Sequence, residues 1–209
     1  MSAFFLRVRK IVMRDPLARY LGAAEDGLLE YSYLDAVRLS GHSCPTVAAA
    51  YQATLEALDH LYPGEVPERG SIRVELRGAI EDGTTGVVAS IAGLITGAAG
   101  EGGFKGIAGR FGRRGLLKFD VPLTADLRFI RVDTARSVEV SLRHAPPMSP
   151  DSIRALQTAF SVDASDSERE EFAHVWQTRV AGMLLPTEAS SLPLRERSVK
   201  LGATAVDAR

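Results

Sequence analysis

The chain has 209 residues, 45% hydrophobic and 24% charged, a composition typical of one soluble globular domain or of one domain with an appendage. Its 25 basic and 26 acidic residues give a net charge of −1, so the overall charge provides no attraction to nucleic acid or to an anionic membrane. We therefore expect neither nucleic acid nor a membrane among its partners.

The N-terminal segment and the single cysteine bear on the cellular compartment. Residues 1–16 start with apolar side chains and then carry Arg7, Arg9 and Lys10, the reverse of the order in a signal peptide. The longest apolar stretch, residues 86–99, is shorter than the roughly 20 residues that span a bilayer. One cysteine allows no intramolecular disulfide. These features favour a cytoplasmic protein.

Hydrophobic periodicity and end signals predict mostly helical structure in the first half. The expected elements are, in order, helix 4–13, helix 16–22, strand 28–33, helix 33–40, helix 45–62, strand 71–76 and helix 84–96. The clearest helix begins at Pro45, has apolar residues at three- and four-residue steps, and stops before Pro63-Gly64. The helix at 84–96 is apolar nearly all round, which indicates burial.

A glycine-rich segment separates this half from the rest. Eight of the 19 residues in 97–115 are glycine. The expected elements beyond it are strands 116–121, 126–132 and 137–142, then helices 150–160 and 166–185. This order predicts an α+β fold with a mostly antiparallel sheet packed with helices, and C-terminal helices appended. We expect an α+β domain at 1–145, a helical extension at 146–186 and a flexible tail at 187–209.

The residues most suited to chemistry are His42 and Cys44, in Gly41-His42-Ser43-Cys44-Pro45. A thiolate and an imidazole on one short turn suit zinc or another divalent transition metal. Gly41 permits the tight bend, and Cys44 falls at a helix N-terminus, which favours negative charge. The residues alone leave three alternatives open: a buried structural cysteine beside a locally bonded histidine, a thiolate ligand to haem iron, or a nucleophilic cysteine with His42 as its base.

Further residues accompany this turn: Asp15-Pro16-Leu17, Leu21-Gly22, and the glycine-rich Thr96-Gly97 with Gly103-Phe104-Lys105-Gly106. With these features, the stretch from Asp15 to about Lys118 resembles the FmdE-like family, which comprises a component of formylmethanofuran dehydrogenase and its stand-alone bacterial relatives. The resemblance implies an α+β fold, a metal, commonly zinc, at the His-x-Cys pair, and a homodimer. Many members carry a further cysteine in the region matching residues 82–90 and a C-terminal zinc ribbon, whereas this chain has Cys44 alone.

Two carboxylates lie between the strand at 71–76 and the helix at 84–96. One interpretation of Glu81 and Asp82 is a turn with a capped helix start, in which Gly83 takes positive φ. The other is that one of them supplies the metal's oxygen ligand in place of the missing cysteine. Asp35, seven residues before His42, is a candidate to orient the imidazole ring.

The glycine-rich segment is locally cationic, because residues 105–118 hold five basic residues and no acid. One interpretation is a mobile loop that closes on a small anionic substrate, with Lys105, Arg110 and Arg113 as its binding residues. The other is a flexible connector or an oligomer contact. The sequence thus predicts a metal-binding protein, and, if it is an enzyme, one whose metal polarises a carbonyl or activates water. The rival is a non-catalytic dimeric binding or accessory module with a structural metal, or with a haem or cofactor-carrier role.

Overall fold

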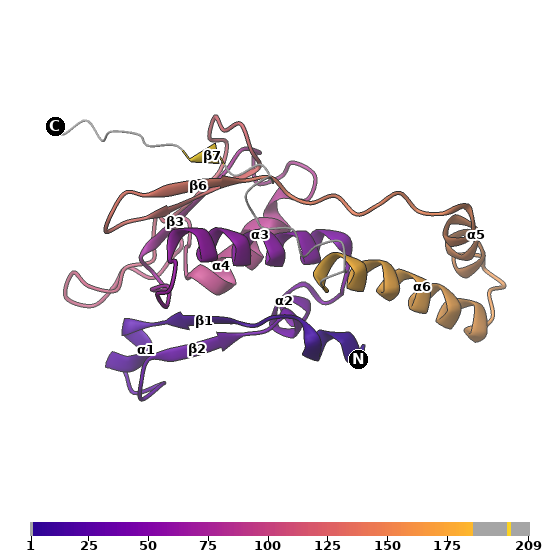
Figure 1. The fold of residues 1–209 in the computed structure, drawn as a ribbon, viewed down its shortest axis with the longest axis horizontal. Coiled ribbons are helices and arrows are strands. Elements are labelled where there is room, and N and C mark those ends of the chain that lie inside the picture. Colours follow the sequence, from indigo (N-terminus) through magenta and orange to yellow (C-terminus); the bar gives the residue numbers. More distant parts are fainter. Residues whose placement is uncertain (1, 186–199, 202–209) are drawn as a thin grey trace.

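The computed structural model describes residues 2–185 and 200–201, which form an α+β fold, as predicted (Figure 1). The described elements are, in chain order, η1 (Ala3–Arg7), β1 (Ile11–Arg14), α1 (Pro16–Tyr20), β2 (Leu28–Tyr31), α2 (Tyr33–Ser40), α3 (Pro45–Leu61), β3 (Ile72–Leu76), α4 (Thr85–Thr96), β4 (Leu117–Lys118), β5 (Leu127–Arg131), β6 (Ser137–Val140), α5 (Pro150–Ala159), α6 (Asp166–Leu184) and β7 (Lys200–Leu201). Among these elements, no helix is long and apolar enough to cross a membrane.

The main sheet has the strand order β4-β3-β5-β6-β7, and β1 and β2 form a separate antiparallel pair. In the main sheet only the pairing of β3 with β4 is parallel, so the predicted predominance of antiparallel strands is confirmed. Alternate residues of β3 and β5 are buried, among them Ile72, Val74 and Phe129. This alternation places one face of the sheet against α3 and α4.

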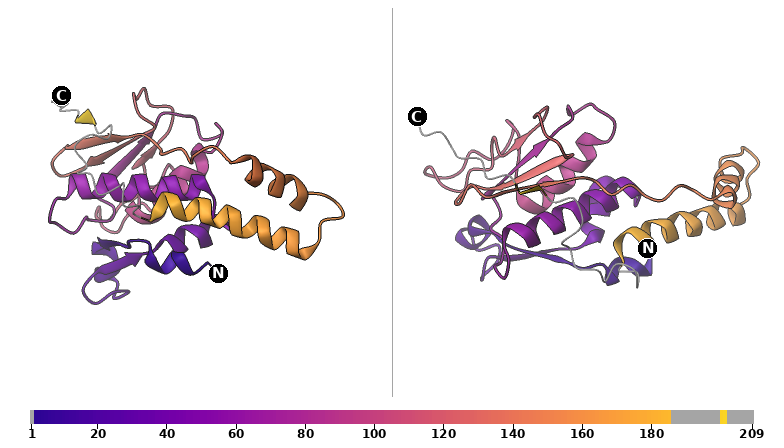
Figure 2. Two further views of the ribbon diagram at one scale, coloured as in Figure 1. Left: turned by 45° about the vertical axis from the view of Figure 1, so that its right-hand side comes forward. Right: turned by 45° about the horizontal axis from the view of Figure 1, so that its top comes forward.

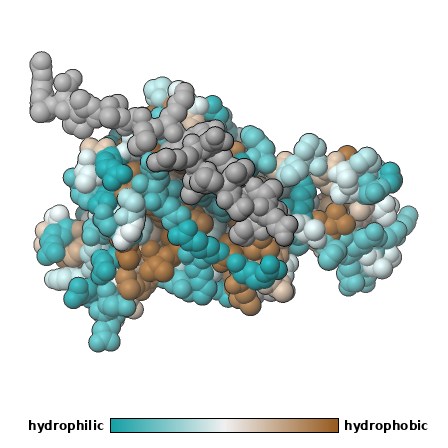
Figure 3. All heavy atoms as spheres, viewed as in Figure 1, coloured by the Kyte–Doolittle hydropathy of each residue, from teal (hydrophilic) through white to brown (hydrophobic). Residues whose placement is uncertain are grey.

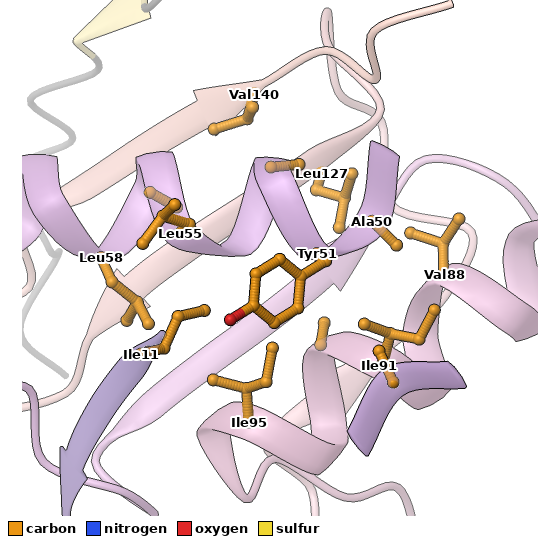
Figure 4. Close-up of a cluster of buried hydrophobic side chains, with 14 of the residues drawn as sticks. Ile11, Ala50, Tyr51, Leu55, Leu58, Val88, Ile91, Ile95, Leu127 and Val140 are labelled. Atoms are coloured by element: carbon orange, nitrogen blue, oxygen red, sulfur yellow. The ribbon is translucent and has the colours of Figure 1, made fainter. Parts of the chain in front are cut away.

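Helix α3 lies at the centre of the core (Figure 4). Tyr51 of α3 is completely buried among apolar side chains that come from α4 and the strands. Its hydroxyl lies 2.8 Å from the carbonyl oxygen of Arg9 and 3.0 Å from that of Tyr31, so it connects the core to the β1–β2 pair. Burial raises the pKa of Tyr51, and the hydroxyl stays protonated as a donor to these carbonyls.

The prediction of a helix at residues 4–13 is wrong. A 3₁₀ turn ends at Arg7, and Ile11–Arg14 forms strand β1. Ile11 and Met13 are buried while Val12 and Arg14 are exposed, which is the period-two pattern of a strand with one buried face. A helix would turn Ile11 and Met13 to opposite sides, whereas pairing with β2 puts both into the core.

The strand predicted at 116–121 is shorter than expected. Only Leu117–Lys118 pairs with β3, and the chain then turns at Asp120, whose φ is 55°. This left-handed conformation interrupts the extended backbone. The amide of Asp120 donates to the carbonyl oxygen of Gly78, so the turn attaches the segment to the end of β3 instead of continuing the sheet.

The two predicted C-terminal helices form an arm that projects from the body of the molecule (Figures 1 and 2). Helix α5 has no buried residue, and α6 has two, Val180 and Leu184, where it packs against α3. The predicted tail at 187–209 lies outside the described residues, apart from Lys200–Leu201, which pairs with β6.

Candidate metal-binding turn

The turn that carries His42 and Cys44 is defined by signals at both of its ends. Helix α2 ends at Ser40 and is followed by its C-cap Gly41, which has a φ of 75°, a left-handed conformation that glycine adopts without a steric penalty. Helix α3 begins with Pro45 at its first position and Cys44 at its N-cap. The sequence therefore places both candidate ligands on a four-residue connection, residues 41–44, between two helices.

Ser43, between the two candidate ligands, is buried and fixed by bonds from distant parts of the chain. Its carbonyl oxygen accepts hydrogen bonds from Trp176 Nε1 at 2.9 Å and from Gln177 Nε2 at 3.2 Å. Its hydroxyl is 2.9 Å from the hydroxyl of Tyr33, which is completely buried. Burial raises the pKa of Tyr33 to about 12, so this hydroxyl is neutral at physiological pH. Helix α6 and Tyr33 thus hold the centre of the turn.

His42 is exposed, and its ring is oriented by the backbone of the preceding helix. Nδ1 lies 2.9 Å from the carbonyl oxygen of Ser40. A carbonyl oxygen only accepts, so this hydrogen bond requires the proton on Nδ1 and leaves the Nε2 lone pair free in the neutral ring. Histidine ligands of metals typically have this arrangement, in which a backbone carbonyl selects the tautomer.

Cys44 is half-buried and contacts the hydrophobic core. Although it occupies the N-cap of α3, its side chain makes no capping hydrogen bond within the described chain. The thiol therefore does not take part in capping α3. At this position the free backbone N–H groups and the positive end of the helix dipole favour a negatively charged ligand atom.

The predicted oxygen ligands have a different local role. Oδ2 of Asp82 accepts a hydrogen bond from the amide of Ala79 at 3.0 Å and so stabilises the turn that precedes α4. The N-cap of α4 is Thr84, whose side chain makes no capping hydrogen bond among the described residues, so the predicted side-chain cap is not formed. Asp82 also lines a cavity of about 530 Å³ beside Asp126, at the start of α4. Glu81 is exposed. In the described part of the chain, no group of three or more His, Cys, Asp or Glu residues is placed to hold a metal ion, so neither carboxylate joins His42 and Cys44 in such a group.

Asp35, the candidate to orient His42, takes part in a helix cap instead. Its Oδ2 accepts from the backbone amide of Ser32 at 2.8 Å and from the Ser32 hydroxyl at 2.7 Å, forming the capping box of α2. Burial raises the pKa of Asp35, but these hydrogen bonds and the nearby Arg38 outweigh it and lower the pKa overall. The orientation of His42 comes from the carbonyl of Ser40.

A cavity of about 640 Å³ lies beside the turn. Its wall combines apolar, hydroxyl, amide and cationic groups from Ser2, Phe5, Leu34, Val37, Arg38, Gly41, Ser43 and Gln177. Oε1 of Gln177 is buried and has no hydrogen-bond partner among the described residues. The cavity thus offers Arg38 as a positive charge close to the residues that flank His42.

The glycine-rich segment lies away from this cavity, and none of its three predicted binding residues lines the wall. Arg113 is buried, and its Nη2 is 2.8 Å from Oδ1 of Asp15. Arg69 Nη1 is 3.0 Å from the other oxygen of the same carboxylate. Lys105 and Arg110 are exposed, and the Arg110 guanidinium lies over the ring of Phe111, 4.8 Å from its centre. Arg113 therefore fixes the segment to the start of α1.

Glycines make room for the buried guanidinium. A Cβ atom on Gly97 would lie 2.0 Å from Arg113 Nη1, and one on Gly70 would lie 2.8 Å from Arg113 Nε. Nε and Nη1 of Arg113 are buried without a hydrogen-bond partner among the described residues, so Asp15 is the counterion that this side chain depends on. We refer to Asp15, Arg69 and Arg113 as the Asp15 cluster.

Comparison with known proteins adds no evidence about the function of the turn. No protein-family model matches the chain, and no curated protein matches it.

Proposed function

We propose that this protein binds a divalent transition metal ion, such as zinc, through Nε2 of His42 and Sγ of Cys44. The observation that carries the proposal is the hydrogen bond between His42 Nδ1 and the Ser40 carbonyl, which leaves Nε2 free two residues before an uncommitted thiol. Imidazole nitrogen and thiolate sulfur are both strong ligands for zinc. The bonds that fix Ser43 support the proposal, because they reduce the entropy lost when the two flanking side chains converge on an ion.

Two protein ligands define what kind of metal site this is. Zinc is usually four-coordinate, and a closed structural site uses four protein ligands. An ion held by His42 and Cys44 keeps positions for water or a bound molecule, where it polarises a carbonyl or lowers the pKa of water. The proposed site is thus open, with one protein ligand fewer than the three that catalytic zinc sites usually have.

The open cavity beside the turn, which Gly41 and Ser43 line next to the two proposed ligands, supports an inference about the class of molecule that the ion would meet. Arg38 contributes a positive charge to the wall, and Phe5, Leu34 and Val37 contribute apolar surface. Arg38 is itself only weakly neutralised, because its Nη1 is 3.4 Å from Asp35 and its side chain is largely exposed. We infer that the substrate is a small anionic molecule with an apolar part.

Cobalt(II) titration tests the proposal, because thiolate coordination produces a charge-transfer absorption in the near ultraviolet. The wild-type protein should give this band with a stoichiometry of one ion per chain, and elemental analysis after zinc loading should agree. Cys44→Ser should abolish the band, and since serine is a good N-cap the variant should keep α3 intact. His42→Gln should weaken cobalt binding strongly.

The control variant is His174→Gln, which alters an exposed histidine on α6 outside the turn and should bind cobalt like the wild type. Circular dichroism of each variant checks that the fold is retained. The proposal is wrong if Cys44→Ser and His42→Gln both retain the wild-type metal content.

A further inference from the structure

The wall of the cavity beside the turn contains a polar atom whose hydrogen-bonding capacity is unused. Gln177 of α6 lines this cavity, and its side-chain oxygen, Oε1, is buried without a hydrogen-bond partner in the described part of the chain. Buried polar atoms in proteins are nearly always hydrogen-bonded, because an unpaired one has lost its hydration without compensation. An unpaired acceptor in a cavity wall therefore indicates a ligand group that pairs with it.

The hydrogen bond at the other end of the amide identifies this atom as the oxygen. Gln177 Nε2 is 3.2 Å from the carbonyl oxygen of Ser43. That carbonyl oxygen only accepts, so the NH₂ group must face it, whereas a flipped amide would bring two acceptors together. The atom left unpaired is therefore an acceptor, and it pairs only with a donor. A hydroxyl or an amide N–H of a bound molecule meets this requirement.

Gln177 lies where α6 passes from the arm to the body of the molecule. The surface of the arm is mostly hydrophilic (Figure 3), whereas Val180 and Leu184, further along the helix, are buried. The neighbouring Trp176 donates to the same Ser43 carbonyl at 2.9 Å. Two hydrogen bonds thus hold this part of α6 against the turn. A side chain that is already fixed loses little conformational entropy when it binds a ligand.

Helix α2 supplies apolar surface and a positive charge to the same wall. Leu34, Val37 and Arg38 line the cavity, and their three- and four-residue spacing puts them on one face of the helix. Nη1 of Arg38 is 3.4 Å from Asp35, and the side chain of Arg38 is 66% exposed, so this weak pair leaves the guanidinium available to an anion. A guanidinium can bind a carboxylate through two parallel N–H groups. The wall therefore matches a carboxylate with an apolar substituent.

We propose that the cavity binds a small apolar carboxylate that carries a hydroxyl or an amide N–H, and that Gln177 selects for this donor. Arg38 binds the carboxylate, and Gln177 Oε1 accepts the hydrogen bond from the donor. Leu34 and Val37 contact the apolar part. The inference rests on the proposed function in one respect, because the molecule that it describes is the one that would meet the proposed ion.

The size of the selection follows from the burial of Gln177 Oε1. An acid with the donor forms a hydrogen bond to an acceptor that is already desolvated, whereas an acid without the donor leaves this acceptor unpaired. Sites built to hydrogen-bond a hydroxyl or N–H discriminate strongly against analogues that lack it. We therefore expect a difference in Kd of at least about tenfold between two acids that differ only in the donor.

Isothermal titration calorimetry with two matched pairs of acids measures this selection. Mandelate differs from phenylacetate by a hydroxyl, and N-acetylleucine differs from N-acetyl-N-methylleucine by an amide N–H. The wild type should prefer the donor-bearing acid of at least one pair by about tenfold or more, and the pair that shows the preference identifies the donor as hydroxyl or N–H. Equal affinities within both pairs, or no binding of any acid at millimolar concentration, overturn the proposal.

Gln177→Met assigns the selection to Oε1, since methionine has a similar length and is a good helix former. This variant should bind both acids of the selective pair as weakly as the wild type binds the acid without the donor. Trp176→Phe is the matched control, because it also removes one hydrogen bond to the Ser43 carbonyl but keeps Oε1, so its preference should remain. Arg38→Gln should weaken binding of all the acids by a similar factor. A preference that persists in Gln177→Met, or that is lost equally in Trp176→Phe, overturns the proposal.

This inference and the proposed metal site fail separately, because calorimetry reports on the acids and cobalt absorption reports on the ion. Neither Gln177 nor Arg38 is a proposed metal ligand, so the preference can also be measured in Cys44→Ser. A wild type without the cobalt band whose preference depends on Gln177 refutes the metal site and leaves the acid-binding cavity. A wild type with the cobalt band but without the preference refutes the selection by Gln177 alone.

Discussion

Replacing Asp15 by asparagine should remove the counterion of two buried or partly buried guanidinium groups. Asp15 is 3% exposed, and its two oxygens receive Arg113 and Arg69 at 2.8 and 3.0 Å. Oδ1 also accepts from the amides of Leu17 and Ala18 as the N-cap of α1. Asparagine is an equally good N-cap, so Asp15→Asn isolates the loss of charge from the loss of capping.

The magnitude follows from how little solvent reaches the two cations. The side chains of Arg113 and Arg69 are 8% and 22% exposed, so water does not replace the carboxylate fully. Removing one partner of a buried ion pair typically costs about 3–5 kcal/mol, and total domain stability is about 5–15 kcal/mol. The amide NH₂ of asparagine would moreover face the donors of Arg69. For a chain of this size the expected fall in Tm is about 6–20 °C.

Urea denaturation followed by circular dichroism measures the loss, with Asp59→Asn as the matched control. Asp59 pairs with Arg9 at 2.6 Å, but these side chains are 37% and 64% exposed. Breaking this surface pair should cost at most about 1 kcal/mol. A change below about 1 kcal/mol in Asp15→Asn would refute the argument, since Arg113 would then not depend on Asp15 inside the protein.

The pH dependence of stability provides a second test of the role of Asp15. Burial raises the pKa of Asp15, but hydrogen bonds from Ala18 and Arg69 and the charge of Arg113 outweigh it, and the pKa falls below its ordinary value of 3.8. A carboxylate whose pKa is lower in the folded state stabilises the fold above its unfolded pKa. This contribution disappears as the pH falls through the folded pKa. The stability difference between the wild type and Asp15→Asn should therefore be constant near neutral pH and shrink in acid below pH 3.8.

Two more substitutions test the packing around the Asp15 cluster and the metal-binding turn. Gly97→Ala introduces a Cβ atom 2.0 Å from Arg113 Nη1 at a φ of 75°, and should lower the free energy of unfolding in urea by at least about 3 kcal/mol. The control is Gly22→Ala, at a φ of 72° with open space around the Cβ position, which should lower it by only about 1–2 kcal/mol. Equal losses in the two variants would show that Arg113 moves aside freely. Trp176→Phe removes one of the two α6 donors to the Ser43 carbonyl and should weaken cobalt binding about tenfold. Unchanged affinity would mean that the hydrogen bond from Trp176 does not position the turn.

Elements whose ends have local signals were predictable from the sequence. Helix α3 begins at a proline and stops before Pro63-Gly64, and α2 ends at a glycine, so short-range sterics determine both. Strand β1 was missed because its stabilisation is non-local. Ile11 and Met13 share a buried face only through pairing with β2 and contact with the core, a situation in which tertiary structure overrides local pattern.

The candidate turn shows the same division between local and distant causes. Gly41 and Pro45 indicated that His42 and Cys44 lie on a tight connection between helices. The groups that hold Ser43 gave no such signal, since Trp176 is 133 positions away in sequence. A tryptophan at helical spacing indicates core packing, and which carbonyl its N–H reaches depends on the position of α6. The pairing of Arg113 with Asp15, 98 positions apart, was hidden in the same way.

The residues quoted for the family resemblance occupy two separate structures. Asp15-Pro16-Leu17 and the glycine-rich segment meet in the Asp15 cluster, whereas Gly41 to Pro45 lies between α2 and α3, where α6 packs. None of the three residues of the cluster lines the cavity beside the turn. The roles of the two structures should therefore separate in experiment. Asp15→Asn should lower the stability of the fold but keep the wild-type metal content at temperatures below the melting temperature of the variant. Cys44→Ser should lose metal but keep the stability of the fold. Loss of metal in folded Asp15→Asn would instead mean that the glycine-rich segment contributes to the metal site.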